Sequence, residues 1–260
     1  MLKEGDIVLI TEISSRHPKS WLLSLAKDTE LSTHLGKIFH NQIIGKKYGE
    51  VIILTKGKAI IMKPSPRDYL RQFKLKTQIL YEDDCAIACS LAGVGSSMKV
   101  GEAGTGSGAL TMFLAYNVQP SGHVFSYEIN EDHLANAQKN LAKTGMTDVV
   151  TFKLQDIRLP IEECEFDAFF LDFSSPYEAI DTVAIVLRGG GHLVCFVPNW
   201  GQVEKTVAQI RKCPYLIHRE TFEITRRNFI VNPNNHIMRP VFRDLVYSGI
   251  LIHAIRINPD

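Results

Sequence analysis

From about residue 98 onward, short apolar runs alternate with stretches whose apolar residues recur every three or four positions. The first pattern predicts buried strands, and the second predicts amphipathic helices. Strands are expected over residues 98–103, 122–129, 149–154, 166–173 and 192–197, and helices over 85–92, 131–143, 178–187 and 201–212, with another helix starting at Ala109. Regular alternation of strands and helices is typical of an α/β fold built on a parallel sheet.

The end of the chain breaks this alternation. Residues 218–224 and 245–257 are both long and β-rich, and the sequence between them predicts no helix. Strands joined without a crossover helix pair in antiparallel fashion, so an antiparallel hairpin is expected to close the otherwise parallel sheet. Earlier in the chain, the three glycines at 189–191 are predicted to end the helix over 178–187, because glycine readily adopts the positive φ of a helix C-cap.

Residues 1–64 follow a different pattern. Short β-rich runs separated by turn residues occur at 5–10, 21–25, 34–39, 49–54 and 59–62. Such closely spaced strands favour a small β-barrel or sandwich, and residues 55–58 indicate a hairpin turn. Pro64 and Pro66 then form a rigid break, since each holds the residue before it extended. We therefore predict a β-barrel-like domain over 1–64, for docking or assembly, followed by an α/β domain over 65–260.

Composition narrows the class of protein without naming a function. The hydrophobic content of 45% and charged content of 22% are ordinary for a soluble globular protein, and neither a run of 18 apolar residues nor a signal-peptide pattern appears. The sequence therefore predicts a cytoplasmic protein. The five cysteines include no Cys-x-x-Cys pair and the nine histidines show no paired ligand spacing, so no metal site is expected. The net charge of +1 does not favour a nucleic-acid partner, but basic pairs such as Arg226-Arg227 leave one open.

A glycine-rich segment indicates a ligand site. It reads Val-Gly-Glu-Ala-Gly-Thr-Gly-Ser-Gly-Ala-Leu at 100–110, and places Gly104, Gly106 and Gly108 between a predicted strand and a predicted helix. Because glycine has no Cβ atom, a ligand approaches this backbone closely, and the amides at the start of the helix face it. A nicotinamide-binding domain is the alternative, although that class prefers Gly-x-Gly-x-x-Gly.

Acidic residues stand where successive predicted strands end, at Glu128, Asp156 and Asp172. Ligands of open α/β sheets lie across the carboxyl ends of the strands, so these carboxylates are expected to face one site. Glu128 follows Gly104 by 24 residues and is placed to accept hydrogen bonds from ribose hydroxyls. For Asp172 the alternative is a capping role at the helix that begins near Pro176.

This constellation resembles the class I methyltransferases that bind S-adenosylmethionine. The resemblance implies a Rossmann-like sheet of seven strands, mostly parallel, with an antiparallel last strand. It also implies that Glu102 contacts the methionine end of the cofactor, Glu128 the ribose, and Asp156 the adenine amino group. The other residues expected at the cofactor are Gln78, Gly104, Thr105, Gly106, Ser107, Gly108, Ala109, Leu110, Gln155 and Asp172.

A narrower resemblance covers essentially the whole chain. It is carried by Pro-Ser-Pro-Arg-Asp-Tyr at 64–69, Gln-Ile-x-Tyr at 78–81, the glycine-rich segment, Arg-Pro at 239–240 and Ser-Gly-Ile-Leu at 248–251. These segments look like those of the tRNA (adenine-N1)-methyltransferases that modify adenosine 58 of the T-loop. The resemblance implies tRNA as the substrate and a homotetrameric assembly, and some archaeal relatives also modify adenosine 57.

Within this resemblance, Asp172 and Tyr81 are the expected catalytic residues. Adenine N1 is a weak nucleophile, and a carboxylate that accepts from the exocyclic amino group orients the ring and raises the electron density at N1. The base must leave the folded tRNA, and stacking on Tyr81 offsets the cost of unstacking. Weaker candidates for contacts to the substrate are Tyr177, Arg239, Arg243 and Tyr247.

Two segments depart from the family pattern. The family's Asp-x-Pro-x-Pro-Trp reads Asp-Phe-Ser-Ser-Pro-Tyr at 172–177, and its His-Thr-Gly reads Tyr-Ser-Gly at 247–249. An aromatic wall and a hydroxyl are kept, while the shape of the base pocket changes. Two other classes therefore stay open: a methyltransferase for another RNA, a small molecule or a protein, and a non-catalytic tRNA-binding subunit. The intact glycines and acidic strand ends argue against the second.

Overall fold

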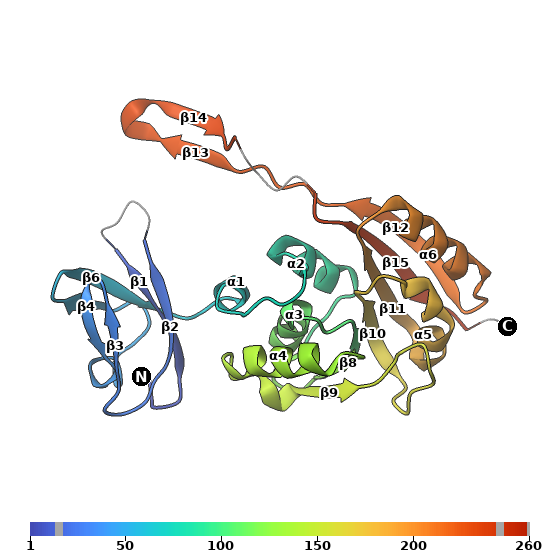
Figure 1. Ribbon diagram of the computed structural model, residues 1–260, viewed down its shortest axis with the longest axis horizontal. Helices are drawn as coiled ribbons and strands as arrows, with labels where there is room; N and C mark the ends of the chain where they lie inside the picture. Colours follow the sequence, from blue (N-terminus) through green and yellow to red (C-terminus); the bar gives the residue numbers. More distant parts are fainter. Residues whose placement is uncertain (14–17, 243–246, 259–260) are drawn as a thin grey trace. The chain divides into compact units, whose positions relative to one another are not determined.

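The computed structural model describes residues 1–13, 18–242 and 247–258, and it divides into two compact units (Figure 1). The first unit contains Met1–Lys74 and Lys139–Gly145, and the second contains Leu75–Gln138 and Met146–Asp260. The prediction of a small β-rich module at the N-terminus is confirmed. The domain boundary expected at Pro64 remains a prediction.

The first unit is built on an antiparallel sheet with the strand order β2-β1-β6-β5. Its elements are β1 (Ile7–Glu12), β2 (Ser20–Ser24), β3 (Glu30–Thr33), β4 (Gly36–Phe39), η1 (His40–Gln42), β5 (Val51–Leu54), β6 (Gly57–Met62) and α1 (Pro66–Leu70). Alternate residues of the strands, such as Val8 and Ile61, are buried in one core, as the two-residue period of a strand requires. The hairpin predicted at 55–58 is confirmed, because Leu54 of β5 pairs directly with Gly57 of β6.

The second unit is built on a seven-stranded sheet with the order β12-β15-β11-β10-β7-β8-β9. Its strands are β7 (Lys99–Ala103), β8 (His123–Glu128), β9 (Val150–Leu154), β10 (Phe166–Leu171), β11 (Leu187–Val197), β12 (Leu216–Glu223) and β15 (Ile250–Arg256). Neighbouring strands from β9 to β11 pair in parallel, whereas β15 is antiparallel to both β11 and β12. The predicted fold class, a mostly parallel sheet with an antiparallel last strand, is confirmed.

Helices cover both faces of this sheet (Figure 1). They are α2 (Glu82–Leu91), α3 (Ala109–Val118), α4 (Glu131–Ala142), α5 (Ile180–Val186) and α6 (Trp200–Lys212), with the short turns η2 (Thr147–Val149) and η3 (Pro176–Glu178). In β11, Leu193 and Cys195 belong to the core beneath α5 and α6, while Val194 faces Ala88 of α2 and Leu110 of α3. Both faces of these strands are therefore apolar, as expected for a parallel sheet buried between two helical layers. No helix among the described residues is long and apolar enough to cross a membrane.

Two predictions about connections are wrong. The glycines at 189–191 lie inside β11 and do not end a helix, because α5 already ends at Val186. Gly190 has a φ of +79°, and the pairing of β10 with β11 shifts register there, which is a bulge rather than a cap. The chain between β12 and β15 also contains a hairpin that the sequence did not predict, formed by β13 (Phe229–Asn232), η4 (Pro233–Asn235) and β14 (Ile237–Pro240).

Candidate active site

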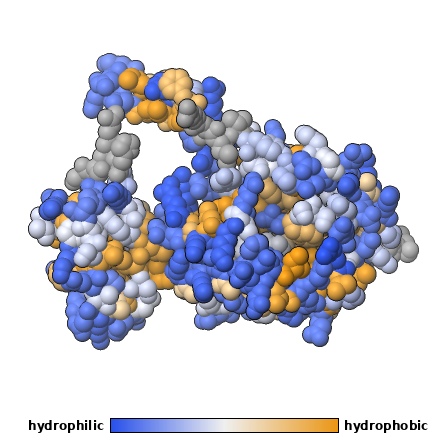
Figure 2. All heavy atoms as spheres, in the orientation of Figure 1, coloured by the Kyte–Doolittle hydropathy of each residue, from blue (hydrophilic) through white to orange (hydrophobic). Residues whose placement is uncertain are grey.

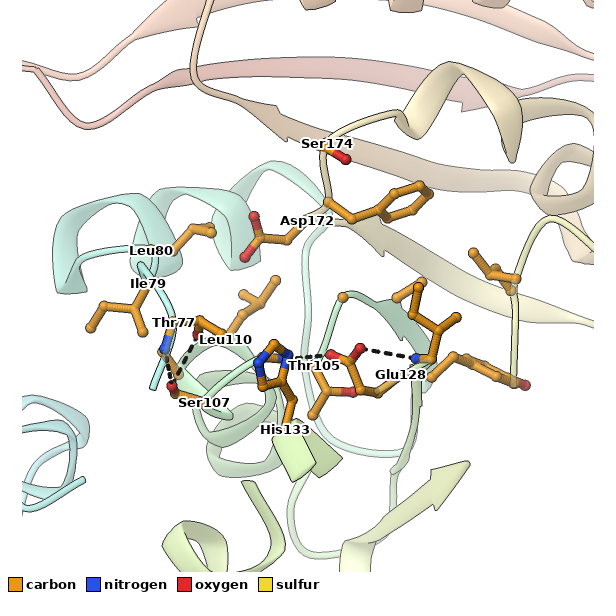
Figure 3. Close-up of a pocket in the computed structure, with 18 of the residues that line it drawn as sticks. Thr77, Ile79, Leu80, Thr105, Ser107, Leu110, Glu128, His133, Asp172 and Ser174 are labelled. Carbon is orange, nitrogen blue, oxygen red and sulfur yellow. Dashed lines mark hydrogen bonds between the residues drawn. The ribbon is translucent and has the colours of Figure 1, made fainter. Parts of the chain in front are cut away.

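A pocket of about 310 Å³ opens at the carboxyl ends of β7, β8, β9 and β10 (Figure 3). The strand order reverses here, because β7 lies between β8 and β10 in the sheet. Open α/β sheets bind their ligands at such a switch point. Most residues predicted at the cofactor line this pocket: Gln78, Gly104, Thr105, Gly106, Ser107, Ala109, Leu110, Glu128, Gln155, Asp156 and Asp172.

The glycines of the turn after β7 all have positive φ, but they serve different contacts. At Gly104 a Cβ atom would lie 2.0 Å from the carbonyl oxygen of Asp172, and at Gly106 it would lie 2.9 Å from Oγ1 of Thr77. Gly108 is the N-cap of α3 rather than a residue of the pocket lining. Glycine is therefore required at 104 for close packing of two strand ends, and at 106 for close approach of the segment before α2.

Ser107 joins this turn to the segment before α2. Its hydroxyl oxygen accepts hydrogen bonds from the amides of Lys76 and Thr77 at 3.0 and 3.2 Å, and it lies 3.0 Å from Oγ1 of Thr77. Figure 3 shows Thr77, Ile79 and Leu80 along one wall of the pocket. The predicted residue Gln78 is carried on this wall.

Glu128, at the end of β8, fastens the same turn from the other side. Its Oε2 accepts the amide of Gly106 at 2.9 Å, and its Oε1 accepts the amides of Ile129 and Asn130 at 2.9 and 3.0 Å. Each carboxylate oxygen keeps further acceptor capacity for a ligand hydroxyl. The backbone thus holds an acceptor in a fixed orientation at the pocket.

Glu102 is buried in β7 beside the pocket instead of lining it. Its Oε2 accepts hydrogen bonds of 2.6 Å from the hydroxyls of Thr111 and Ser126, whereas Oε1 has no hydrogen-bond partner among the described residues. Loss of hydration on burial raises the pKa of Glu102 to about 7, against the lowering effect of the two hydroxyls. Its direct contact with a ligand, expected from the resemblance, remains a prediction.

We expect the Glu102→Gln variant to remove part of the pH dependence of stability in the ligand-free protein. The folded protein raises the pKa of Glu102 from 4.5 to about 7, so this group's contribution is fully present below pH 4.5 and is lost as the pH rises through about 7. The free energy of unfolding of the natural protein should therefore fall more steeply across this range than that of the variant. Denaturant titrations between pH 4.5 and about 7 measure the difference, and parallel curves would contradict it.

Asp172 directly follows β10 and is aimed at the pocket (Figure 3). Its amide donates to the carbonyl of Ala103 at 2.9 Å, which fixes the backbone. In the described parts of the chain, no group donates a hydrogen bond to its carboxylate. The predicted alternative, in which Asp172 caps a helix, is therefore not observed, and the N-cap residue of η3 is Ser175. Desolvation raises the pKa of Asp172 well above its ordinary value, and repulsion from Glu102, Asp84 and Glu128 adds to this.

Asp156 is held by an arginine that the sequence interpretation missed. Nε and Nη2 of Arg158 donate to its carboxylate at 2.9 and 2.7 Å, and Nη1 donates to Glu178 at 3.0 Å. These contacts hold the pKa of Asp156 below its ordinary value. Ser175 also donates to Glu178 at 3.0 Å, so the network reaches the loop that follows Asp172.

The predicted substrate residues lie outside this pocket lining. Tyr81 is 40% exposed and is the N-cap of α2, and Tyr247 is 42% exposed with its hydroxyl donating to the carbonyl of Pro198 at 2.7 Å. Tyr177 lies in η3 with the ammonium of Lys205 over its ring. Arg239 is in β14 with its guanidinium 4.3 Å from the centre of the Phe242 ring. Arg243 lies outside the described residues.

Other lining residues were not among those predicted at the cofactor, including Thr77, Ile79, Leu80, Ile129, His133, Ile157, Phe173, Ser174 and Ser175. Most of them stand one or two positions from a predicted residue. A rule that extended each strand-end acid to its neighbours would have found Ile129, Ile157 and Phe173. His133 is on the first turn of α4, and no sequence signal marked it. Among the described residues no group of three or more potential ligands could hold a metal ion.

The mostly parallel sheet with its antiparallel β15, the glycine turn at the switch point and the acidic strand ends define a class I methyltransferase. A model of the family described as tRNA methyltransferase complex GCD14 subunit matches residues 57–244, and the chain belongs to this family.

The known proteins that are similar to the chain are methyltransferases. The tRNA (adenine(58)-N(1))-methyltransferase TrmI of Thermus thermophilus is 28% identical over 243 residues, which cover 92% of this chain and 94% of the relative. The structure of an S-adenosylmethionine-dependent O-methyltransferase from Thermotoga maritima is 33% identical with a TM-score of 0.82, and it covers 100% of this chain and 96% of that one. The structure of tRNA (m1A58) methyltransferase TrmI from Aquifex aeolicus is 28% identical with a TM-score of 0.76, covering 99% of both chains.

Proposed function

We propose that the protein transfers a methyl group from S-adenosylmethionine to N1 of adenosine 58 in the T-loop of tRNA. The observation that carries this proposal is the Asp172 carboxylate, which faces the pocket without a hydrogen-bond donor among the described residues. It is an acceptor available to the exocyclic amino group of adenine. The family assignment and the names of the two TrmI relatives supply the acceptor class.

The residues of the pocket fit S-adenosylmethionine. Gly104 and Gly106 line the pocket without side chains, and Glu128 presents a fixed acceptor to ribose hydroxyls. Asp156, oriented by Arg158, is the acceptor for the adenine amino group of the cofactor. When bound, the cofactor supplies an activated methyl group on a positively charged sulfur. The surrounding carboxylates repel one another in the ligand-free protein. A positively charged sulfur bound among them would relieve this repulsion.

Asp172 orients the target base and accepts the proton that its amino group loses. Methylation at N1 makes the exocyclic amino group more acidic, and a carboxylate that accepts its hydrogen bond is placed to take that proton. Because the pKa of Asp172 is raised, it lies closer to neutral pH, and a group whose pKa is near the working pH exchanges protons more readily. Alignment of N1 with the methyl carbon supplies the rest of the acceleration.

The exposed aromatic side chains of Tyr81 and Tyr247, and the partly buried one of Tyr177, suit a base swung out of the tRNA. We assign the stacking role to Tyr81, with Tyr177 and Tyr247 as further contacts, because aromatic faces stabilise unstacked bases. Arg239 and Arg243 are assigned to tRNA phosphates. The 1–64 domain is proposed as a docking or assembly module, and the cytoplasm is proposed as the place of the reaction.

Incubation of the purified protein with an unmodified tRNA transcript and S-adenosylmethionine tests the proposal. Nucleoside mass spectrometry should detect 1-methyladenosine in the natural transcript and none in a matched transcript with guanosine at position 58. 1-Methyladenosine found at position 57 as well as at position 58 would extend the target to adenosine 57. Calorimetric binding of the cofactor without any methylated nucleoside would assign the pocket to another acceptor, such as the oxygen that the Thermotoga O-methyltransferase is named for.

The β13–β14 hairpin supports the proposed homotetramer. In the part of the chain that the structure describes, its strands pair only with each other. They expose large apolar side chains, which Figure 2 shows in orange among polar neighbours. They include Phe229, Ile230, Val231, Ile237 and Met238, with exposed fractions from 40% to 76%. A two-stranded hairpin is marginally stable in water by itself, and exposed apolar groups of this kind favour burial against another chain.

A charge on this hairpin is expected to disrupt the assembly. The single chain has a mass of 29.2 kDa, and light scattering on the natural protein should give about four times that value. Val231→Asp or Met238→Asp places a carboxylate at a position that is 62% or 76% exposed in one chain, and it should lower the measured mass without unfolding the chain. The Glu223→Lys variant, at the exposed end of β12, is the control for a charge change alone. An unchanged mass in both aspartate variants would exclude the hairpin as the contact.

A further inference from the structure

Asp84 is a buried carboxylate that lies beside the candidate site without lining its pocket. It is the third residue of α2 and is only 2% exposed. Its two oxygens have different partners: Oδ2 accepts the amide of Tyr81 at 3.2 Å, and Oδ1 accepts the hydroxyl of Ser248 at 2.8 Å. One carboxylate therefore joins the start of α2 to the segment before β15.

The two partners of Asp84 are far apart in sequence: Tyr81 is itself assigned to the substrate, and Ser248 is next to a residue that is. Ser248 is 164 residues from Asp84 and directly follows Tyr247. The hydroxyl of Tyr247 is itself held by the carbonyl of Pro198. Packing of α2 against β11 and β15 brings the two segments together. Asp84 thus fixes the backbone of one exposed tyrosine and the neighbour of another.

Among the described residues, no cation compensates for the burial of Asp84. Its neighbours Glu82 and Asp83 are paired with Arg226, whereas no lysine, arginine or histidine in the described residues lies within ion-pair distance of Asp84. Burying a carboxylate in this way is costly, and its hydrogen bonds offset only part of that cost. The capping box at the start of α2 accounts for the hydrogen bond from Tyr81, whereas the bond to Ser248 serves no helix cap and points to a role in geometry.

We propose that Asp84 is a positioning residue for the methyl-transfer site, which fixes Tyr81 and the Tyr247-Ser248 segment relative to Asp172 through its two hydrogen bonds. The inference rests on the proposed function, because Tyr81 and Tyr247 are assigned there to the target base. It also accounts for Ser248, where the family pattern has threonine: a hydroxyl is all that the contact requires. Misplacing a reacting group by about 1 Å is enough to lower a rate about 100-fold.

The test compares variants that remove or retain these hydrogen bonds. Asp84→Ala and Ser248→Ala should each lower kcat at saturating tRNA about 10-fold or more, with the Kd of S-adenosylmethionine changed by less than about twofold. Asp84→Asn keeps both contacts, because its amide oxygen accepts from Tyr81 and its amide nitrogen donates to the Ser248 hydroxyl. It should therefore retain most of the natural kcat. The double variant Asp84→Ala/Ser248→Ala should be no slower than Asp84→Ala alone.

Asp83→Ala is the matched control, since it removes a carboxylate from the same turn of α2 at a partly buried position, where the carboxylate pairs with Arg226 rather than with Ser248. Its kcat should equal that of the natural protein. The inference is overturned if Asp84→Asn is as slow as Asp84→Ala, or if Ser248→Ala is fully active, and the serine variant decides the matter if Asp84→Ala fails to fold. Absence of 1-methyladenosine with the natural protein would instead overturn the proposed function.

Discussion

The Asp172→Ala variant is expected to lose methyl transfer while it keeps the cofactor. Removing the carboxylate aimed at the proposed base position eliminates both the acceptor for the exocyclic amino group and the site that takes its proton. Groups of this kind contribute roughly 10²- to 10⁴-fold to a rate, so kcat should fall by that factor. Single-turnover assays on tRNA, with calorimetry for S-adenosylmethionine, separate the loss of chemistry from a loss of binding.

Asp172→Asn distinguishes the two tasks of this carboxylate. The amide oxygen still accepts a hydrogen bond but does not take up the proton, so an intermediate kcat is expected. Because burial and the neighbouring carboxylates raise the pKa of Asp172, its ionised fraction and the natural kcat should increase with pH, whereas the asparagine variant should lack that rise. An alanine variant with natural kcat would remove Asp172 from the mechanism.

The Gly104→Ala variant is expected to show the second large effect, on both stability and cofactor binding. The residue has a φ of +93°, and a Cβ atom would lie 2.0 Å from the carbonyl oxygen of Asp172 and 2.7 Å from its carbonyl carbon. Since backbone atoms provide both contacts, the ends of β7 and β10 must separate. Left-handed backbone strain of about 1–2 kcal/mol and overpacking of about 1–3 kcal/mol should together lower the free energy of unfolding by about 3 kcal/mol.

Gly93→Ala is the control for backbone strain alone. Gly93 has a φ of +59°, but a Cβ atom there would meet nothing within 4 Å. We expect a loss of only about 1–2 kcal/mol and unchanged binding of S-adenosylmethionine. Chemical denaturation and calorimetry on both variants provide the comparison. Equal losses in the two would show that the close approach of Gly104 to Asp172 does not matter.

The elements that the sequence predicted well are those with local signals. The alternation of apolar and amphipathic stretches predicted the strands from β7 to β11 and their order along the chain, because residue periodicity records which faces are buried. The glycine turn and Glu128 were predicted for a similar reason. A positive φ and a carboxylate at a strand end are both visible in a few consecutive residues.

Where the prediction failed, distant contacts decide the structure. The glycines at 189–191 look like a helix end in isolation, but the pairing of β11 with β10 and β15 draws them into a strand. The β13–β14 hairpin was missed because its apolar side chains are exposed in the single chain, so no alternation of buried and exposed positions marks it.

The sequence by itself determined that this protein has an α/β sheet, a glycine turn shaped for a ligand and carboxylates at the strand ends, because each of these depends on neighbours along the chain. Only the tertiary structure decided the state of those carboxylates. Packing leaves Asp172 without a donor among the described residues, pairs Asp156 with Arg158 and joins Asp84 to Ser248 across 164 positions. Desolvation and hydrogen bonding depend on what the folded chain brings into contact, and sequence spacing does not record that.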